Sequence, residues 1–323
     1  PEAQPVLARA SATDPADRYP SSAAFLADLD AALGEEPLEP IAPVTRNPFK
    51  GLRAFDEGDA GDFYGREELV GTLVAALSVR RWVTVVGPSG SGKSSAVQAG
   101  LLPTLSQGVV DGSAEWFHVR FTPGSHPAEA LIETLESIAT RPVALSSLID
   151  AGDLAGATDL LLGDAGGELL LVVDQFEELF TLTEDPLLRD EFLGLLVQAV
   201  SAPGSRLRVM ATLRADFYDR PLRYESIGRL VRDATIPVLP LAADELERAI
   251  VDPAHSVGSE YEPGLVAEIM ADVNDQPGAL PLLQYALTEL WERRVSGLLT
   301  RDAYRQRGGV TGALARQAEQ LFA

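Results

Sequence analysis

Residues 82–94 read Trp-Val-Thr-Val-Val-Gly-Pro-Ser-Gly-Ser-Gly-Lys-Ser, and this stretch decides the fold. Trp82–Val86 is rich in β-branched residues and predicts a buried strand. Gly87–Ser94 matches the pattern G-x-x-x-x-G-K-[ST] in full. Glycines let the backbone curl until successive N–H groups point at phosphate oxygens, and the positive end of a following helix adds to that field. The stretch therefore predicts a strand, a phosphate-binding loop and a helix.

Two side chains of this loop have specific expected roles. Lys93 supplies a charge to the β- and γ-phosphates of a nucleotide, and the Ser94 hydroxyl takes one position around Mg²⁺. A chance Gly/Ser-rich turn is the competing interpretation, but the flanking strand and helix are the context that a true phosphate loop requires. Lys50 and Lys93 are the only lysines of the chain, so a lysine inside the pattern is hard to attribute to chance. The residues expected to contact the nucleotide here are Gly87, Pro88, Ser89, Gly90, Ser91, Gly92, Lys93, Ser94 and Ser95.

From Pro48 onward, apolar runs typical of buried strands alternate with helical patterns. The runs are nearly continuous in apolar residues, as expected for parallel strands covered on both faces. We therefore predict an α/β fold, a parallel sheet with helices on both faces, followed beyond Ala242 by an all-helical lid subdomain. The predicted strands are Trp82–Val86, Trp116–Phe121, Leu169–Val173, Leu207–Leu213 and Thr235–Leu239.

Acidic residues follow the third predicted strand in the run Asp174-Gln-Phe-Glu177-Glu178. A carboxylate delivered at the end of a buried strand suits a Mg²⁺ position, which we assign to Asp174 together with Ser94. Glu178, with Glu177 as the alternative, is the expected base that orients and deprotonates the attacking water. An ordinary solvated helix start is the competing interpretation, because acids favour helix N-termini.

An arginine ends the fourth predicted strand, in Thr212-Leu213-Arg214. Ligands of doubly wound sheets bind at the carboxyl ends of the strands, so Arg214 is placed to reach a γ-phosphate. The alternative is a surface arginine paired with Asp216 or Asp219.

Composition narrows the range of partners. The chain has 48 acidic and 26 basic residues and a net charge of −22. Such a surface repels polyanions and predicts no nucleic-acid partner and no binding to anionic membranes. No cysteine is present, which excludes disulfides, thiolate metal sites and a cysteine nucleophile. With no long apolar run and no leader pattern, we expect a cytoplasmic segment without a membrane span, excerpted from a longer protein because it begins Pro1-Glu2.

The motifs together resemble the STAND class of P-loop NTPases, and most of all its bacterial novel STAND family. Five stretches carry the resemblance besides the phosphate loop, and the resemblance covers residues 47–323. They are Asn47-Pro-Phe-Lys-Gly-Leu-Arg-Ala-Phe55, Phe63-Tyr-Gly-Arg66-Glu-Glu68, Asp174-Gln-Phe-Glu-Glu178 with Thr212-Leu-Arg214, and Gly278-Ala-Leu-Pro281. The last has one more residue between Gly and Pro than the family's Gly-x-Pro pattern.

This resemblance implies ATP and Mg²⁺ as cofactors, Arg66 and Pro281 near the base and ribose, and the strand order 5-1-4-3-2. It further implies a regulatory switch between an effector domain and a repeat sensor, often of WD repeats, with homo-oligomerisation among the expected interactions. The residues alone leave ATP against GTP open, since no Asn-Lys-x-Asp guanine motif occurs.

A second resemblance lies at the beginning of the chain. The run from Val6 to Phe25, with Asp14-Pro-Ala-Asp17-Arg18-Tyr-Pro20, is similar to the C-terminal end of serine/threonine protein kinases, where an arginine in the place of Arg18 pairs with a glutamate. An unrelated amphipathic helix pair is the alternative. The expected divisions are 1–34 (kinase-like tail), 35–46 (Pro-rich linker), 47–242 (NTPase core), 243–300 (helical lid) and 301–323 (the start of a winged-helix-like segment).

The leading hypothesis is thus a slowly hydrolysing ATPase switch in signal transduction, coupling a kinase-like effector to a repeat sensor. Two alternatives stay open. One is a scaffold that binds ATP or ADP without significant turnover, and the other is a DNA-associated ATPase of the same superfamily.

Overall fold

The protein is described from a computed structural model. The structure describes Arg9, residues 46–139, 145–274, Gly278, residues 280–310 and residues 312–313. The chain divides into two compact units, residues 1–46 and 47–323. The expected kinase-like tail lies outside the described residues except for Arg9, and all the helices and strands named below belong to the second unit.

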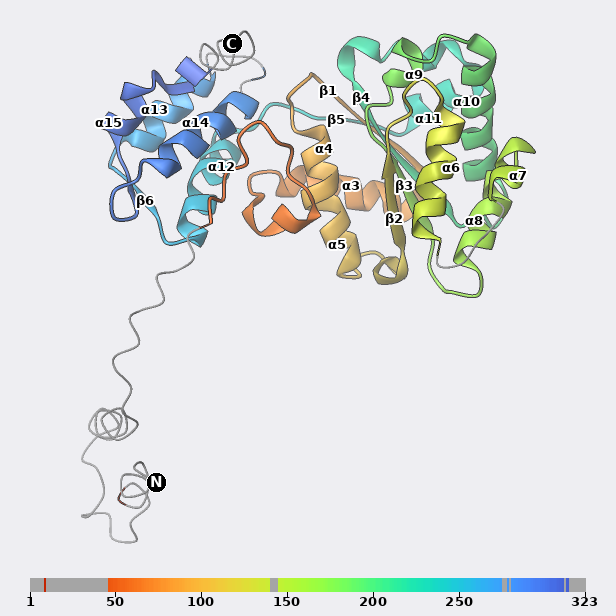
Figure 1. Ribbon diagram of the computed structural model, residues 1–323, viewed down its shortest axis with the longest axis horizontal. Helices are drawn as coiled ribbons and strands as arrows, with labels where there is room; N and C mark the ends of the chain where they lie inside the picture. Colours follow the sequence, from red (N-terminus) through yellow and green to blue (C-terminus); the bar gives the residue numbers. More distant parts are fainter. Residues whose placement is uncertain are drawn as a thin grey trace. The chain divides into compact units, whose positions relative to one another are not determined.

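A five-stranded parallel sheet forms the centre of this unit (Figure 1). Its order, β2-β3-β4-β1-β5, confirms the predicted order 5-1-4-3-2. In the register of β1 with β4, Gly87 lies beside Arg214, so the loop after β1 begins next to the end of β4. The strands are β1 (Trp82–Gly87), β2 (Phe117–Phe121), β3 (Leu169–Val173), β4 (Leu207–Arg214) and β5 (Thr235–Pro237).

Strand β5 is shorter than predicted, ending at Pro237 instead of Leu239. Proline has no backbone N–H, so the residue cannot donate to the neighbouring strand. A proline is tolerated here because β5 is the edge of the sheet. The chain stays beside β1 for one more residue, since the Val238 N–H donates to the Val86 carbonyl at 2.7 Å.

Helices cover both faces of the sheet, as predicted (Figure 1). Alternation along β3 shows why: Leu169, Leu171 and Val173 pack into one apolar core, and Leu170 and Val172 pack into the other. The first core is closed by α6 (Pro127–Ile138), α7 (Leu145–Asp150), α8 (Leu154–Leu162), α9 (Glu178–Thr181), α10 (Pro186–Ser201) and α11 (Glu225–Asp233). The second is closed by α3 (Glu67–Val79) and by the helical run α4 (Lys93–Ser95), the π-helical turn η3 (Ala96–Leu101) and α5 (Leu102–Ser106).

Short 3₁₀ turns connect several of these elements. They are η2 (Glu57–Asp62), η4 (Ser113–Glu115), η5 (Ala215–Phe217) and η6 (Pro221–Arg223). No helix among the described residues is long and apolar enough to cross a membrane.

A separate apolar core holds the C-terminal part together. It is built by α12 (Ala243–Ser256), α13 (Leu265–Asn274), α14 (Leu280–Glu292) and α15 (Arg301–Gln306). The expectation of helices alone is wrong in one detail, because β6 (Glu260–Tyr261) pairs in parallel with β7 (Leu298–Leu299). A strand of two residues is too short to show the alternation of apolar and polar residues from which strands are predicted. Of the expected winged-helix-like segment, residues 311 and 314–323 lie outside the described residues.

Candidate functional site

The phosphate loop joins β1 to α4 in the predicted way. Gly90 and Gly92 take positive φ angles of 73° and 86°, which curl the loop over the first turn of α4. The Lys93 ammonium donates to the carbonyls of Gly87 at 2.9 Å and Pro88 at 2.8 Å. Burial lowers the pKa of Lys93, and the carboxylate of Glu177 is the strongest opposing influence. A buried cation thus lies at a helix N-terminus, the arrangement that receives phosphate.

Oxygen atoms suited to Mg²⁺ meet next to this lysine. The Ser94 hydroxyl donates to Asp174 Oδ1 at 2.7 Å, and the Thr212 hydroxyl donates to the same oxygen at 2.7 Å. Arg120 approaches Asp174 Oδ2 at 3.5 Å. Mg²⁺ prefers oxygen ligands and is held in such sites by one or two protein groups plus phosphates, and no cluster of three or more acidic or histidine ligands occurs among the described residues. The hydroxyl and carboxylate pair of Ser94 and Asp174 therefore fits Mg²⁺.

The acidic turn after β3 is tied to the end of β4. Gln175 takes a positive φ of 53°, and its N–H donates to the Thr212 hydroxyl at 3.0 Å. Glu177 is buried, and its Oε2 accepts the Arg214 N–H at 3.2 Å. Glu178 is half-buried; burial raises the pKa of its carboxyl, against a lowering by the backbone of Gly124. Both candidate bases thus lie beside the strand ends, and Glu177 is the one that acts on Lys93.

Arg214 lies where the sequence places it, at the end of β4 beside Gly87. Its guanidinium pairs with Asp216 and lies 5.4 Å from the centre of the Phe217 ring. The Asp216 carboxylate raises the pKa of Arg214. The structure therefore has Arg214 in the alternative arrangement, paired with Asp216. Its Nε is nevertheless buried without a hydrogen-bond partner among the described residues.

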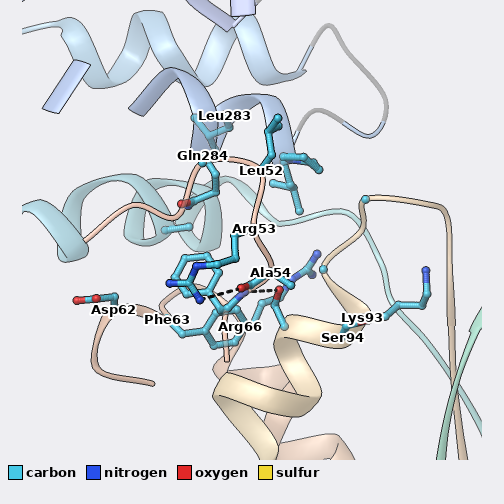
Figure 2. Close-up of a pocket in the computed structure, with 18 of the residues that line it drawn as sticks. Leu52, Arg53, Ala54, Asp62, Phe63, Arg66, Lys93, Ser94, Leu283 and Gln284 are labelled. Atoms are coloured by element: carbon cyan, nitrogen blue, oxygen red, sulfur yellow. Dashed lines mark hydrogen bonds between the residues drawn. The ribbon is translucent and has the colours of Figure 1, made fainter. Parts of the chain in front are cut away.

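A cleft of about 240 Å³ lies on the other side of the phosphate loop. One wall is formed by residues 51–55 of a segment, residues 49–55, that turns where the Arg53 N–H donates to the Lys50 carbonyl and that we call the strap. The opposite walls come from residues 62–66 and from α14. Figure 2 shows Leu283 and Gln284 on α14 beside the strap, with Lys93 and Ser94 at one end of the cleft. The cleft joins the phosphate loop and is lined mostly by apolar groups, as a nucleoside pocket requires.

Arg66 lines this cleft but is held by the backbone. Its guanidinium donates to the carbonyls of Leu239 at 2.8 Å and Ser91 at 3.0 Å. Burial lowers its pKa, opposed by the charge of Glu245. The preceding Gly65 packs so closely on α12 that an added Cβ would lie 2.2 Å from the Glu245 carbonyl oxygen. Arg66 therefore joins the phosphate loop to the segment leading into the helical part.

Pro281 touches the phosphate loop directly. A Cβ on Gly90 would lie 3.2 Å from Pro281 Cγ, and one on Gly278 would lie 3.6 Å from the Ser89 carbonyl oxygen. Ser95 is turned toward the strap, because its hydroxyl accepts the Phe55 N–H at 3.2 Å. The helical part and the strap thus both reach the nucleotide loop.

Three residues of the site were not assigned by sequence reasoning. Thr212 holds Asp174, and its position two residues before Arg214 on the same strand was the available signal. Lys50 and Gln284 meet in the cleft wall although 234 positions separate them. No local pattern marks such a contact.

Comparisons with known proteins agree with this geometry. The family profile described as Novel STAND NTPase 1 matches residues 48–323. The Walker-type ATPase of Pyrococcus abyssi aligns with a TM-score of 0.56 at 18% identity, covering 84% of this chain and 75% of that one. The Aeropyrum pernix ORC2 protein, in ADPNP and ADP complexes, gives 0.60 at 13% identity over 84% and 72%. No curated protein matches the sequence.

Two further similar structures are described as bound to DNA. The Aeropyrum pernix ORC1 protein in complex with DNA gives a TM-score of 0.53 at 16% identity, covering 79% of this chain and 65% of that one. Drosophila ORC bound to DNA gives 0.52 at 16% identity over 79% and 62%. At these identities the likeness shows the fold alone, but it does not fit the expectation that the chain has no nucleic-acid partner.

Proposed function

The chain belongs to the Novel STAND NTPase 1 family, and we propose that it is a Mg²⁺-dependent ATPase that works as a regulatory switch. The contact of Ser94 with Asp174 at 2.7 Å, next to the buried Lys93, carries this proposal. It brings a phosphate-binding cation and a Mg²⁺-type oxygen pair to one place, as ATP binding requires.

In the proposed chemistry the loop amides and Lys93 bind the β- and γ-phosphates, and Ser94 with Asp174 holds Mg²⁺. When bound, Mg²⁺ neutralises charge on the phosphate oxygens. Thr212 keeps the Asp174 carboxylate in place through its hydroxyl. We assign Glu177 as the base that accepts a proton from the attacking water, because it is buried after β3 and bonded to the backbone at the end of β4, beside the phosphate loop. Its Oε2 accepts the Arg214 N–H, which leaves the second carboxylate oxygen, Oε1, to accept the proton.

The switch uses the contacts of the loop with the helical part. Arg214 lies beside Gly87, and exchange of its partner from Asp216 to a γ-phosphate would report the nucleotide state. Pro281 packs on Gly90 from the other side. Because both contacts involve one loop, a change in the γ-phosphate can alter the position of α14. ATP and ADP then favour different arrangements, which is what a switch needs.

The two adjacent acids provide the experiment. Glu177→Gln should lower Mg²⁺-dependent ATP turnover about a hundredfold or more, while ATP binding persists. Glu178→Gln, the same chemical change one residue away, is the matched control and should cost much less. If both variants hydrolyse ATP at the parent rate, neither acid is the base. A turnover that is negligible in the parent and insensitive to both changes would support the scaffold alternative.

The domains proposed to flank the switch rest on the resemblance to STAND proteins and to protein kinases. We propose that the kinase-like residues 1–34 connect it to an effector and that a repeat sensor, with homo-oligomerisation, completes the signalling unit. A longer product of the same gene, tested for protein phosphorylation with and without Lys93→Ala, would check this coupling. Equal phosphorylation by both would refute it.

A second candidate function is an ATPase that acts on DNA. The DNA-bound structures of similar fold favour it, whereas the net charge of −22 opposes it. Fluorescence anisotropy with a labelled duplex between about 50 and 200 mM salt separates the two. Binding that weakens steeply with salt would favour the DNA function, and the signalling proposal expects none.

A further inference from the structure

We infer that Gln284 and the strap recognise the base of the nucleotide and select adenine over guanine. This inference rests on the proposed nucleotide-binding function and adds the residues that choose the base. It follows from how the strap is anchored and from which hydrogen-bonding groups the cleft presents.

The strap is fixed at both ends. At its start, Phe49 is buried in the helical core, with its ring 6.4 Å from that of Trp291. At its end, the Phe55 N–H donates to the Ser95 hydroxyl of the phosphate-loop helix, and its ring lies 5.4 Å from that of Phe63. The part between them forms a wall of the cleft, so the wall is held to both halves of the site.

Lys50 fixes the strap between these anchors. Its ammonium lies 2.8 Å from Asp59 and 2.9 Å from Asp62, and its side chain is almost fully buried. Its backbone N–H donates to Gln284 Oε1 at 3.1 Å. A lysine bonded at both its side chain and its backbone has little freedom, so the Gln284 amide that it contacts is oriented.

The orientation of Gln284 decides what it offers a ligand. Because Oε1 accepts the Lys50 N–H, the Nε2 group remains as a donor, and among the described residues it makes no hydrogen bond. Gln284 lines the cleft beside Leu283 (Figure 2). An oriented N–H donor pairs with a ring nitrogen that accepts. On the same edge N1 of adenine accepts, whereas N1 of guanine carries a hydrogen, which leaves O6 as the only acceptor for this donor.

The described cleft wall also offers guanine no free carboxylate. The N1–H and N2 amine of guanine need acceptors, and Asp62 supplies the one carboxylate of that wall. That carboxylate is 1% exposed and bonded to the Lys50 ammonium. To use this carboxylate, guanine would have to compete with Lys50 for it, and a site disfavours a ligand that disrupts a buried ion pair.

The test replaces the donor by an acceptor without changing its shape. In Gln284→Glu one oxygen still accepts the Lys50 N–H, and the other now accepts from a base. Calorimetry with ADP, GDP and inorganic tripolyphosphate measures base and phosphate recognition separately. The parent should prefer ADP over GDP, and Gln284→Glu should reduce that preference by about tenfold or more, the size of one hydrogen bond gained and one lost. Tripolyphosphate, which has no base, should bind both equally.

Gln198→Glu, the same change at an exposed position of α10, is the control and should keep the parent preference. If Gln284→Glu also loses tripolyphosphate, Gln284→Met decides instead, and it should bring ADP and GDP toward equal affinity. An unchanged ADP preference in the variant that still binds tripolyphosphate, or a parent that prefers GDP, overturns the inference. A parent that binds none of the three ligands refutes the proposed function itself.

Discussion

The two halves of the nucleotide site are built in different ways. The phosphate half is one continuous loop, residues 87–94, backed by the neighbouring strand ends at Asp174 and Arg214, and its polar groups bond to one another. The base half joins the strap to α14, whose contact residues Lys50 and Gln284 are 234 positions apart. Phosphate binding is therefore encoded locally, whereas base recognition depends on the helical part folding against the core.

The two lysines of the chain divide between these halves. Lys93 turns its ammonium to carbonyls of the phosphate loop, where nucleotide phosphates would compete for it. Lys50 is neutralised by Asp59 and Asp62 and supports the cleft wall. Lys93 therefore contributes its charge to ligand binding, whereas Lys50 holds the cleft wall in place.

The largest expected effect is in the phosphate half. Lys93→Ala should weaken binding of ATP at least tenfold, about 1.4 kcal/mol, because the cation that meets the β- and γ-phosphates is removed. Tripolyphosphate should lose affinity to the same degree, since the change leaves the base half intact. Calorimetry with both ligands checks this. Unchanged ATP affinity would disprove the phosphate-loop assignment and with it the division into halves.

A smaller effect is expected where the two halves touch. Gly90→Ala and Gly92→Ala each place a side chain at a positive φ angle, which costs about 1 kcal/mol. The new Cβ at position 90 would also lie 3.2 Å from Pro281 Cγ, whereas nothing lies within 4 Å of a Cβ at position 92. Denaturant unfolding should show a loss in both variants. Hydrogen exchange of α14 should rise in Gly90→Ala alone, and an equal rise in both would mean that Pro281 does not join the halves.

The smallest effect is expected for Ser95→Ala. The change leaves the Phe55 N–H without its acceptor, which costs about 0.5–1 kcal/mol and loosens the strap. ADP affinity should fall about threefold, and tripolyphosphate affinity should not change. A parallel loss for both ligands would place the Ser95 hydroxyl in the phosphate half, as the loop pattern alone suggests.

The sequence was sufficient for the sheet and for the phosphate half. Near-continuous apolar strands and a full loop pattern are local properties, and the acid and arginine at strand ends follow from how parallel sheets place ligands. Thr212 as the partner of Asp174 and Gln284 as the partner of Lys50 depend on strand register and on packing of distant segments, which no local pattern reports. The strap lies within a motif that the sequence shows, but its role as a cleft wall depends on how the chain folds.

Hydrogen exchange measures whether the nucleotide state moves the helical part. A γ-phosphate that recruits Arg214 contributes about 1–3 kcal/mol, enough to shift a two-state equilibrium roughly five- to 150-fold. With a non-hydrolysable ATP analogue and with ADP, each at saturation, protection should differ across α12 (Ala243–Ser256) and α14 (Leu280–Glu292). Arg214→Ala should erase the difference. Identical protection with both nucleotides in the parent would contradict the switch and leave a nucleotide-binding scaffold.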